Sequence, residues 1–170
     1  MARTDGGTVH SLERAYGGGE PRPLGGYLFT LSIYSSIVGA LTMAARRTGR
    51  RPPDRIEPFD MLLMGIATHK LSRLLAKESV TSVLRAPFTR YVRATGESEV
   101  NEQVRGEGVR HAVGELVSCP FCLAVWVATG FAAGLVFLPR LTRLTAATAT
   151  AVAASDFLQL LYDRAKPSSG

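Results

Sequence analysis

The chain has 170 residues, 46% of them hydrophobic, and a formal net charge of +6 at pH 7. Its length suits one compact domain with tails, and a total of two cysteines excludes a scaffold held together by disulfides. Because the basic residues crowd the ends of long apolar blocks, the positive charge favours contact with anionic lipid headgroups and argues against nucleic acid as a partner.

The first apolar block occupies residues 27–45 and follows a polar tail. Residues 1–26 are rich in glycine and proline, a composition that cannot bury a core, so we expect this tail to be disordered. Residues 27–45 contain no charged side chain and are about long enough to cross the ~30 Å hydrocarbon layer of a bilayer. They predict a first transmembrane helix, and the basic linker at 46–58 ends it.

The second block, residues 59–78, is apolar in its first half and cationic in its second half. Because His69, Arg73 and Lys77 share one face at helical spacing, the block predicts an amphipathic helix that either lies at the membrane interface or spans the bilayer. The segment 79–118 that follows is basic and polar. We expect it to be a cytoplasmic loop.

Two further apolar blocks, residues 120–138 and 144–163, predict a C-terminal transmembrane hairpin. Residues 139–143, which include a proline and two arginines, are expected to form the short turn between them. The first of these blocks carries Gly130 and Gly134 at GxxxG spacing, a pattern that indicates a surface for close helix contact.

The orientation of these blocks follows from where lysine and arginine fall. The helices to be oriented are those of the expected fold class, an all-α membrane protein with three to four transmembrane helices. If residues 59–78 lie at the interface, 15 basic residues are cytoplasmic and five are outside, whereas the division is 13 to seven if they span. We prefer the first arrangement. Both arrangements place the loop 77–118 and the C-terminal tail, 164–170, in the cytoplasm.

Two stretches of the sequence form a recognisable pair of motifs, ATHKLSRLLAKESVTSVLRAPFTRY at residues 67–91 and GELVSCPFCLAVWVA at residues 114–128. In this order and spacing they resemble the DUF1360 family of small bacterial integral membrane proteins. The resemblance implies a membrane domain over residues 59–163, in a family that is linked by name to sporulation in some bacilli. It implies no reaction and no catalytic residues, and the tail and the first apolar block lie outside it.

The cysteine pair, Cys119 and Cys122, lies at the start of the third apolar block. Pro120 suits the first turn of a helix, so we expect Cys119 at the N-cap, where free N–H groups and the helix dipole favour a thiolate. One interpretation is a membrane thiol–disulfide oxidoreductase linked to a quinone, with Cys119 as nucleophile and Cys122 as resolving thiol. The other is a structural motif with two reduced thiols, because a cytoplasmic face keeps thiols reduced.

A zinc site is a further hypothesis for the same pair. Structural zinc takes four ligands, and His69 and His111 could complete a set with Cys119 and Cys122. The histidines lack the compact spacing of zinc-finger motifs, so solvated or core histidines are the favoured interpretation. No cofactor is predicted, and zinc or a quinone enters only under these alternatives.

A cluster of six basic residues lies within 24 residues of the chain, with leucine, valine and aromatic side chains between them. At about 1 kcal/mol per basic residue near an anionic surface, the cluster could bind lipid headgroups or a protein partner. The alternative is anchoring by the positive-inside rule without a specific ligand. The six residues are Lys70, Arg73, Lys77, Arg85, Arg90 and Arg93.

Asp156 is an acidic residue in the fourth block, ~9 Å along the helix from its end. A carboxylate at such a depth costs free energy unless it is protonated or paired, and it marks a functional candidate by default. Its expected partners are His69, Lys70 or Arg73, or else it makes a structural polar contact between helices.

The leading functional hypothesis is a non-enzymatic accessory or scaffold protein of the cell membrane, acting alone, as a homo-oligomer or with a membrane protein partner. Its basic cytoplasmic face would contact anionic lipid or that partner. The two alternatives are the thiol oxidoreductase and an oligomeric, transporter-like or proton-handling unit centred on Asp156.

Overall fold

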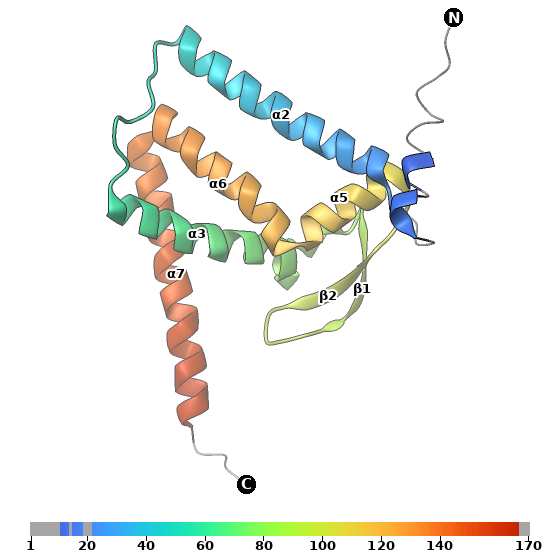
Figure 1. Ribbon diagram of the computed structural model, residues 1–170. Coiled ribbons are helices and arrows are strands. Elements are labelled where there is room, and N and C mark those ends of the chain that lie inside the picture. The colour runs from blue at the N-terminus through green and yellow to red at the C-terminus, as the bar shows by residue number, and fades with distance from the viewer. Residues whose placement is uncertain (1–10, 14, 19–21, 167–170) are drawn as a thin grey trace, which may run out of the picture. The chain divides into compact units, whose positions relative to one another are not determined.

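The computed structural model describes residues 11–13, 15–18 and 22–166 of the chain (Figure 1). Most of these residues are helical, and two short strands are present among them. The elements in chain order are α2 (Leu24–Arg47), α3 (Pro58–Lys77), η1 (Ser79–Thr81), α4 (Ser82–Arg85), β1 (Thr89–Ala94), β2 (Val100–Val104), α5 (Gly108–Ser118), α6 (Pro120–Phe137) and α7 (Pro139–Ala165).

The N-terminal tail is helical in part. Residues 11–13 and 15–17 are in helix and α2 begins at Leu24, which corrects the expectation of disorder for this part of the tail. The rest of that expectation falls on positions that lie outside the described residues, as does most of the C-terminal tail. These positions are 1–10, 14, 19–21 and 167–170.

The described chain divides into two compact units. The hairpin unit, named for its β1–β2 hairpin and distinct from the α6–α7 helical hairpin, lies within residues 1–39 and 76–119. It contains β1, β2 and α5. The helical unit lies within residues 40–75 and 120–170 and contains α6 and α7. Helices α2 and α3 each contribute residues to both units. Each unit has its own interior and is described separately.

The core of the helical unit is built largely from alanine. Ala67 of α3 and Ala146 of α7 are fully buried, and Ala149 and Phe131 complete the buried cluster. Small side chains let helix backbones approach closely, the usual way in which membrane helices pack. Partly buried hydrophobic side chains surround this cluster, namely Leu63, Met64, Leu71 and Val127.

Helices α6 and α7 form the C-terminal hairpin that the sequence predicts, with Leu138 alone between them. The expected turn at residues 139–143 is wrong, because these residues are the first turn of α7. Pro139 causes the early start, since proline suits the first helical position, where its missing N–H has no partner to lose. A Cβ atom at Gly134 would collide with the side chain of Thr142, so this glycine permits the close approach of α6 to α7.

The hairpin unit corrects the prediction of an all-α fold and of a loop over residues 79–118. Strands β1 and β2 pair antiparallel, with an irregular register between Tyr91 and Arg93, and η1, α4 and α5 occupy much of the rest of the segment (Figure 1). Helix α5 packs on this hairpin through Gly114, where an added Cβ would collide with Val104.

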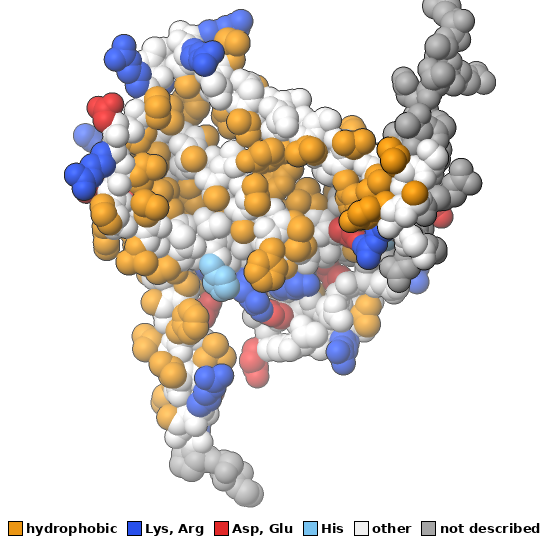
Figure 2. All heavy atoms as spheres, in the orientation of Figure 1, with side chains coloured by type: hydrophobic (Ala, Val, Ile, Leu, Met, Phe, Trp, Pro, Cys, Tyr) orange, Lys and Arg blue, Asp and Glu red, His pale blue; other side chains and the backbone are white. Residues whose placement is uncertain are grey.

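Three helices of the described chain, α2, α6 and α7, are long and apolar enough to cross a membrane. By length and composition, this confirms that residues 27–45, 120–138 and 144–163 belong to helices that could cross a membrane. Helix α3 is not among them. Large hydrophobic side chains are exposed on these helices, including Leu31 (59%), Phe121 (87%) and Leu158 (67%). Figure 2 shows such side chains along the projecting part of α7, which is the surface expected of a helix in contact with lipid.

Candidate functional site

Asp156 of α7 forms an ion pair with Lys70 of α3 in the helical unit. The Lys70 Nζ and Asp156 Oδ2 atoms are 2.9 Å apart, and the side chains are 15% and 45% exposed. Lys70 is one of the three cations expected as partners for this carboxylate. A cation and an anion that neutralise each other in this way lower the cost of placing both near the hydrocarbon region of a bilayer.

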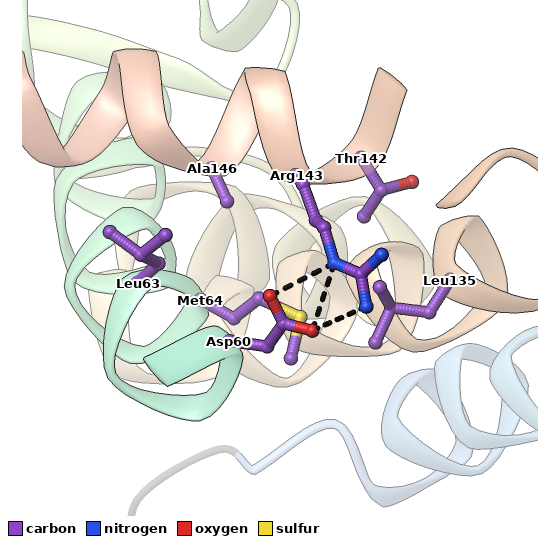
Figure 3. A pocket seen from close by; sticks show the side chains of 7 residues that line it. All are labelled: Asp60, Leu63, Met64, Leu135, Thr142, Arg143 and Ala146. Carbon is purple, nitrogen blue, oxygen red and sulfur yellow. Dashed lines mark hydrogen bonds and ion pairs between the residues drawn. The ribbon is translucent and has the colours of Figure 1, made fainter. Parts of the chain in front are cut away.

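A second ion pair joins the same two helices at their N-terminal ends (Figure 3). The guanidinium of Arg143 donates from Nε and Nη2 to the carboxylate of Asp60, at distances of 2.7 to 3.0 Å. Such two-pronged contacts fix orientation as well as charge. Asp60 is buried at 8% exposure, and the apolar side chains around the pair fill the pocket, which leaves no room for a ligand. Sequence reasoning missed this pair because Asp60 and Arg143 stand at block ends, where charges are normally solvated.

Three polar contacts show that α3 and α7 run in the same direction. Asp60 contacts Arg143, the Thr150 hydroxyl donates to the Leu63 carbonyl at 2.9 Å, and Lys70 contacts Asp156. Both residue numbers of each pair rise together along the two helices. Helix α3 therefore starts at the α6–α7 turn and runs along α7 towards the C-terminal end of that helix.

The linker between α2 and α3 also lies at the α6–α7 turn. Arg50 donates from Nη1 to the carbonyl oxygen of Phe137 at 2.8 Å. The arrangement preferred from the sequence places the linker and the turn on opposite sides of a membrane, and the arrangement in which residues 59–78 also cross places them on the same side. The basic count alone could not separate the two. Five linker arginines and three tail arginines exchange sides between them, so 15 to five becomes 13 to seven and both divisions stay positive-inside.

Arg85 lies in the interior of the hairpin unit and not on a basic face. Its side chain is 1% exposed and its Nε donates to Glu102 Oε2 at 2.7 Å. The same guanidinium donates to the Thr81 hydroxyl at 2.8 Å and to the Glu78 carbonyl at 3.1 Å. Arg85 is thus withdrawn from the lipid-binding or partner-binding cluster, and its role is to hold α4 against β2.

The remaining members of the predicted basic cluster differ in accessibility. Lys70 is committed to Asp156, and Lys77, the last residue of α3, is half-buried. Arg73, Arg90 and Arg93 are exposed. Of the predicted cluster, the exposed members in the hairpin unit that could bind an acidic group are therefore the two arginines of β1, Arg90 and Arg93.

His111 lies beside a carboxylate of its own helix. Its Nε2 is 3.5 Å from Glu115 Oε1, and its Nδ1 is 3.2 Å from the Gly106 carbonyl oxygen. Glu115 also accepts a hydrogen bond of 2.5 Å from the Tyr27 hydroxyl, which joins α5 to the start of α2. Among the residues that the structure describes, no three histidine, cysteine or acidic side chains gather closely enough to hold a metal ion. The set His69, His111, Cys119 and Cys122 therefore has no geometric support as a zinc site.

The cysteine pair spans the junction between α5 and α6. Cys119 follows Ser118, the last residue of α5, and precedes Pro120, the first residue of α6, with the extended φ and ψ values of −103° and 109°. It therefore stands at the N-cap position expected from the sequence. Cys119 is half-buried and Cys122 is exposed, and no disulfide joins them in the described structure. Their redox chemistry stays a prediction.

The described chain is, as a class, a small and mainly helical protein with three helices suited to a membrane, and its buried charged residues Asp60 and Arg85 form ion pairs. The family described as "Protein of unknown function (DUF1360)" matches residues 63–162, more than half of the chain. The chain belongs to the DUF1360 family, which confirms the resemblance seen in the sequence.

Two curated relatives come from Bacillus subtilis (strain 168). The chain is 34% identical over 76 residues to the sporulation protein YjcA, a match that covers 43% of this chain and 64% of that protein. It is 27% identical over 89 residues to the UPF0713 protein YngL, covering 52% of this chain and 66% of that protein. Both matches span slightly less than two thirds of the relatives' length. No solved structure matches the chain.

Proposed function

We propose that this protein is an integral membrane protein with a structural role, an accessory or scaffold that holds the hairpin unit at the cytoplasmic surface. The observation that carries the proposal is the distribution of side chains in the helical unit. Large hydrophobic side chains of α6 and α7 face outwards, whereas Lys70 with Asp156 and Asp60 with Arg143 are paired. A protein in water usually shows the opposite distribution.

The polar contacts support a four-crossing arrangement for this scaffold. Because α3 starts at the α6–α7 turn and runs along α7, it crosses together with that helix and returns the chain to the side of the hairpin unit. With the hairpin unit inside, 13 basic residues are cytoplasmic and seven are outside, which satisfies the positive-inside rule. The exposed Arg90 and Arg93 then face the acidic headgroups of the inner leaflet or an acidic partner.

Paired charges favour a structural role over transport or redox chemistry in this proposal. The three ion pairs of Lys70, Asp60 and Arg85 each join separate elements of the chain. Groups that are engaged with one another in this way hold helices and strands in place. The thiol oxidoreductase and the proton-handling unit remain the alternatives from the sequence.

The proposal is tested by placing a charge on an outward-facing apolar position. Val125 of α6 is 53% exposed, and the matched control, Gln103 of β2, is exposed outside the helical unit. An aspartate in the middle of a membrane helix costs about 2.5–3.5 kcal/mol on insertion scales. We expect V125D to lose the alkaline-carbonate-resistant membrane fraction and Q103D to keep it. Wild-type protein released by carbonate, or V125D retained like Q103D, would contradict membrane integration.

A further inference from the structure

Three large aliphatic side chains project together from the short helical turn after α3. Val80, Val83 and Leu84 are 79%, 73% and 62% exposed. They lie on η1 and α4 at positions i, i+3 and i+4, so they share one helical face. Contiguous apolar side chains this exposed mark a contact surface for a protein or for a membrane. We call these three residues the apolar knuckle.

The opposite side of the same turn is fixed from inside the hairpin unit. Arg85 is 1% exposed and its guanidinium bonds the Glu102 carboxylate, the Thr81 hydroxyl and the Glu78 carbonyl. The serines of the turn also close it, because the Ser82 hydroxyl donates to the Ser79 carbonyl at 2.6 Å. The turn is therefore held in one conformation before it meets anything, which lowers the entropy cost of docking.

The position of the knuckle in the chain indicates that its occupant is the bilayer. Helix α3 ends at Lys77, and Val80 follows three residues later, so at most about 11 Å of chain separates them. In the proposed arrangement Lys77 stands where α3 leaves the membrane, at headgroup level. The knuckle is consequently within reach of the boundary between headgroups and acyl chains, where apolar side chains of interfacial helices insert.

The charge of the surrounding segment indicates how the knuckle binds. Residues 76–119 contain six lysine and arginine residues and six acidic residues, so this part of the hairpin unit has no net formal charge. Attraction to anionic lipid is therefore weak over the segment as a whole. The free energy of docking must come mainly from burial of apolar area, at roughly 25 cal/mol per Å².

We infer that Val80, Val83 and Leu84 insert into the interfacial layer of the bilayer and seat the hairpin unit on the membrane surface. The inference rests on the proposed membrane location of α3, α6 and α7 and adds a second, separate membrane contact. Its binding energy is apolar, so it needs no anionic lipid and persists at high salt.

The experiment places an environment-sensitive nitrobenzoxadiazole probe on single cysteines in a C119S/C122S background, in phosphatidylcholine nanodiscs. The probed positions are Val83 in the knuckle, Gln103 on β2 as the water-exposed control, and Val125 on α6 as the lipid-facing control. At position 83 we expect blue-shifted emission, quenching by nitroxide-labelled lipid and resistance to iodide, unchanged in 1 M salt. At position 103 we expect quenching by iodide and not by lipid.

The controls separate the two proposals. If Val125 is not quenched by lipid nitroxides, the membrane location itself is wrong. If Val125 is quenched but the Val83 probe behaves like the one at Gln103, only the docking inference is overturned. A probe at Val83 that resists both quenchers is covered by protein, which also overturns it, and a signal that disappears in high salt contradicts the apolar mechanism.

A tryptophan version avoids replacing the cysteines. The chain contains one tryptophan, so V83W/W126F and Q103W/W126F each carry a single reporter at the knuckle or at the control position. We expect quenching by brominated lipid for the first variant and none for the second. Equal quenching of both variants, or of neither, contradicts insertion of the knuckle.

Discussion

At the scale of single residues, the ion pairs decide what the polar side chains of this chain can do. The sequence predicts two roles for Lys70, as part of a basic cluster and as a partner for Asp156. The 2.9 Å contact with Asp156 supports the second role. Arg85 is likewise drawn inside by Glu102. Spacing along the chain could not identify these contacts, because each pair joins residues that are 17 or more positions apart.

Replacing Asp156 in the Lys70–Asp156 ion pair should destabilise the helical unit. Asp156→Asn leaves the Lys70 ammonium, 15% exposed, without its anion, so we expect a loss of about 1–3 kcal/mol in the free energy of unfolding in detergent. The apolar double variant K70M/D156L should recover most of the loss, because well-packed apolar groups replace an ion pair at little cost.

The control for this prediction lies on the same helix. Asp163 and Lys166 form an exposed ion pair, with side chains 62% and 57% exposed, and exposed pairs contribute little. D163N should therefore melt like the wild type. A D156N protein that is as stable as D163N, or a double variant less stable than D156N, would show that the Lys70–Asp156 pair does not hold α3 against α7.

The two cysteines should differ in reactivity towards a water-soluble maleimide. Cys122 is the more exposed thiol, but it lies within the apolar helix α6, which the proposed function places in the bilayer, away from a reagent dissolved in water. Cys119 is half-buried at the junction of α5 and α6, outside the apolar helix, where a reagent dissolved in water reaches it more readily. We expect faster alkylation in C122S, which keeps Cys119, than in C119S, with rates followed by mass spectrometry. Faster alkylation of Cys122, or protection of both thiols until a chelator is added, would contradict a metal-free N-cap thiol.

At the scale of elements, the long helices were predictable and the hairpin unit was not. Uncharged blocks of about 19 residues predict α2 and α6 within a few residues, because a helix satisfies all its backbone hydrogen bonds within a single apolar segment. Strand β1, by contrast, has no clear apolar alternation: Thr89 is buried, and the five residues after it are all exposed. The strand exists because Thr89 and Glu102 meet Arg85 inside the unit, a contact that only the folded chain creates.

The two glycines of the GxxxG pattern in α6 have different surroundings, and a pair of variants tests whether they differ in importance. A Cβ at Gly134 would collide with Thr142, whereas nothing lies within 4 Å of a Cβ at Gly130. Gly134→Ala should therefore destabilise the α6–α7 hairpin by about 1–3 kcal/mol through overpacking. Gly130→Ala should be neutral or stabilise α6 by up to about 0.5–1 kcal/mol, because alanine loses less entropy in a helix. Melting temperatures in detergent measure both, and equal effects would place the helix contact elsewhere on α6.

At the scale of the whole molecule, the sequence limits the arrangement to two topologies, and the one proposed above is that in which α3 also crosses. Both topologies keep the loop 77–118 and the C-terminus inside, and they differ only in α3 and the tail. Hydropathy could not decide between them, because His69, Lys70, Arg73 and Lys77 lower the apparent suitability of α3 for a membrane. That appearance is misleading for Lys70, whose charge is neutralised by Asp156 on α7. A pairing between distant helices is invisible to a count made along the chain.

Accessibility mapping separates the two topologies through the linker between α2 and α3. Arg50 contacts the Phe137 carbonyl, so single cysteines at Asp54 in the linker and Arg140 at the start of α7, both exposed, should lie on the same side of the membrane. In a C119S/C122S background, we expect an impermeant maleimide to label both in intact cells, whereas a cysteine at Ser98 of the hairpin unit reacts only after permeabilisation. In the three-crossing arrangement Asp54 would be protected with Ser98, and only Arg140 would react. Labelling of that kind would contradict the crossing of α3. Labelling of a cysteine at Ser98 in intact cells would show that the protein has the opposite orientation in the membrane.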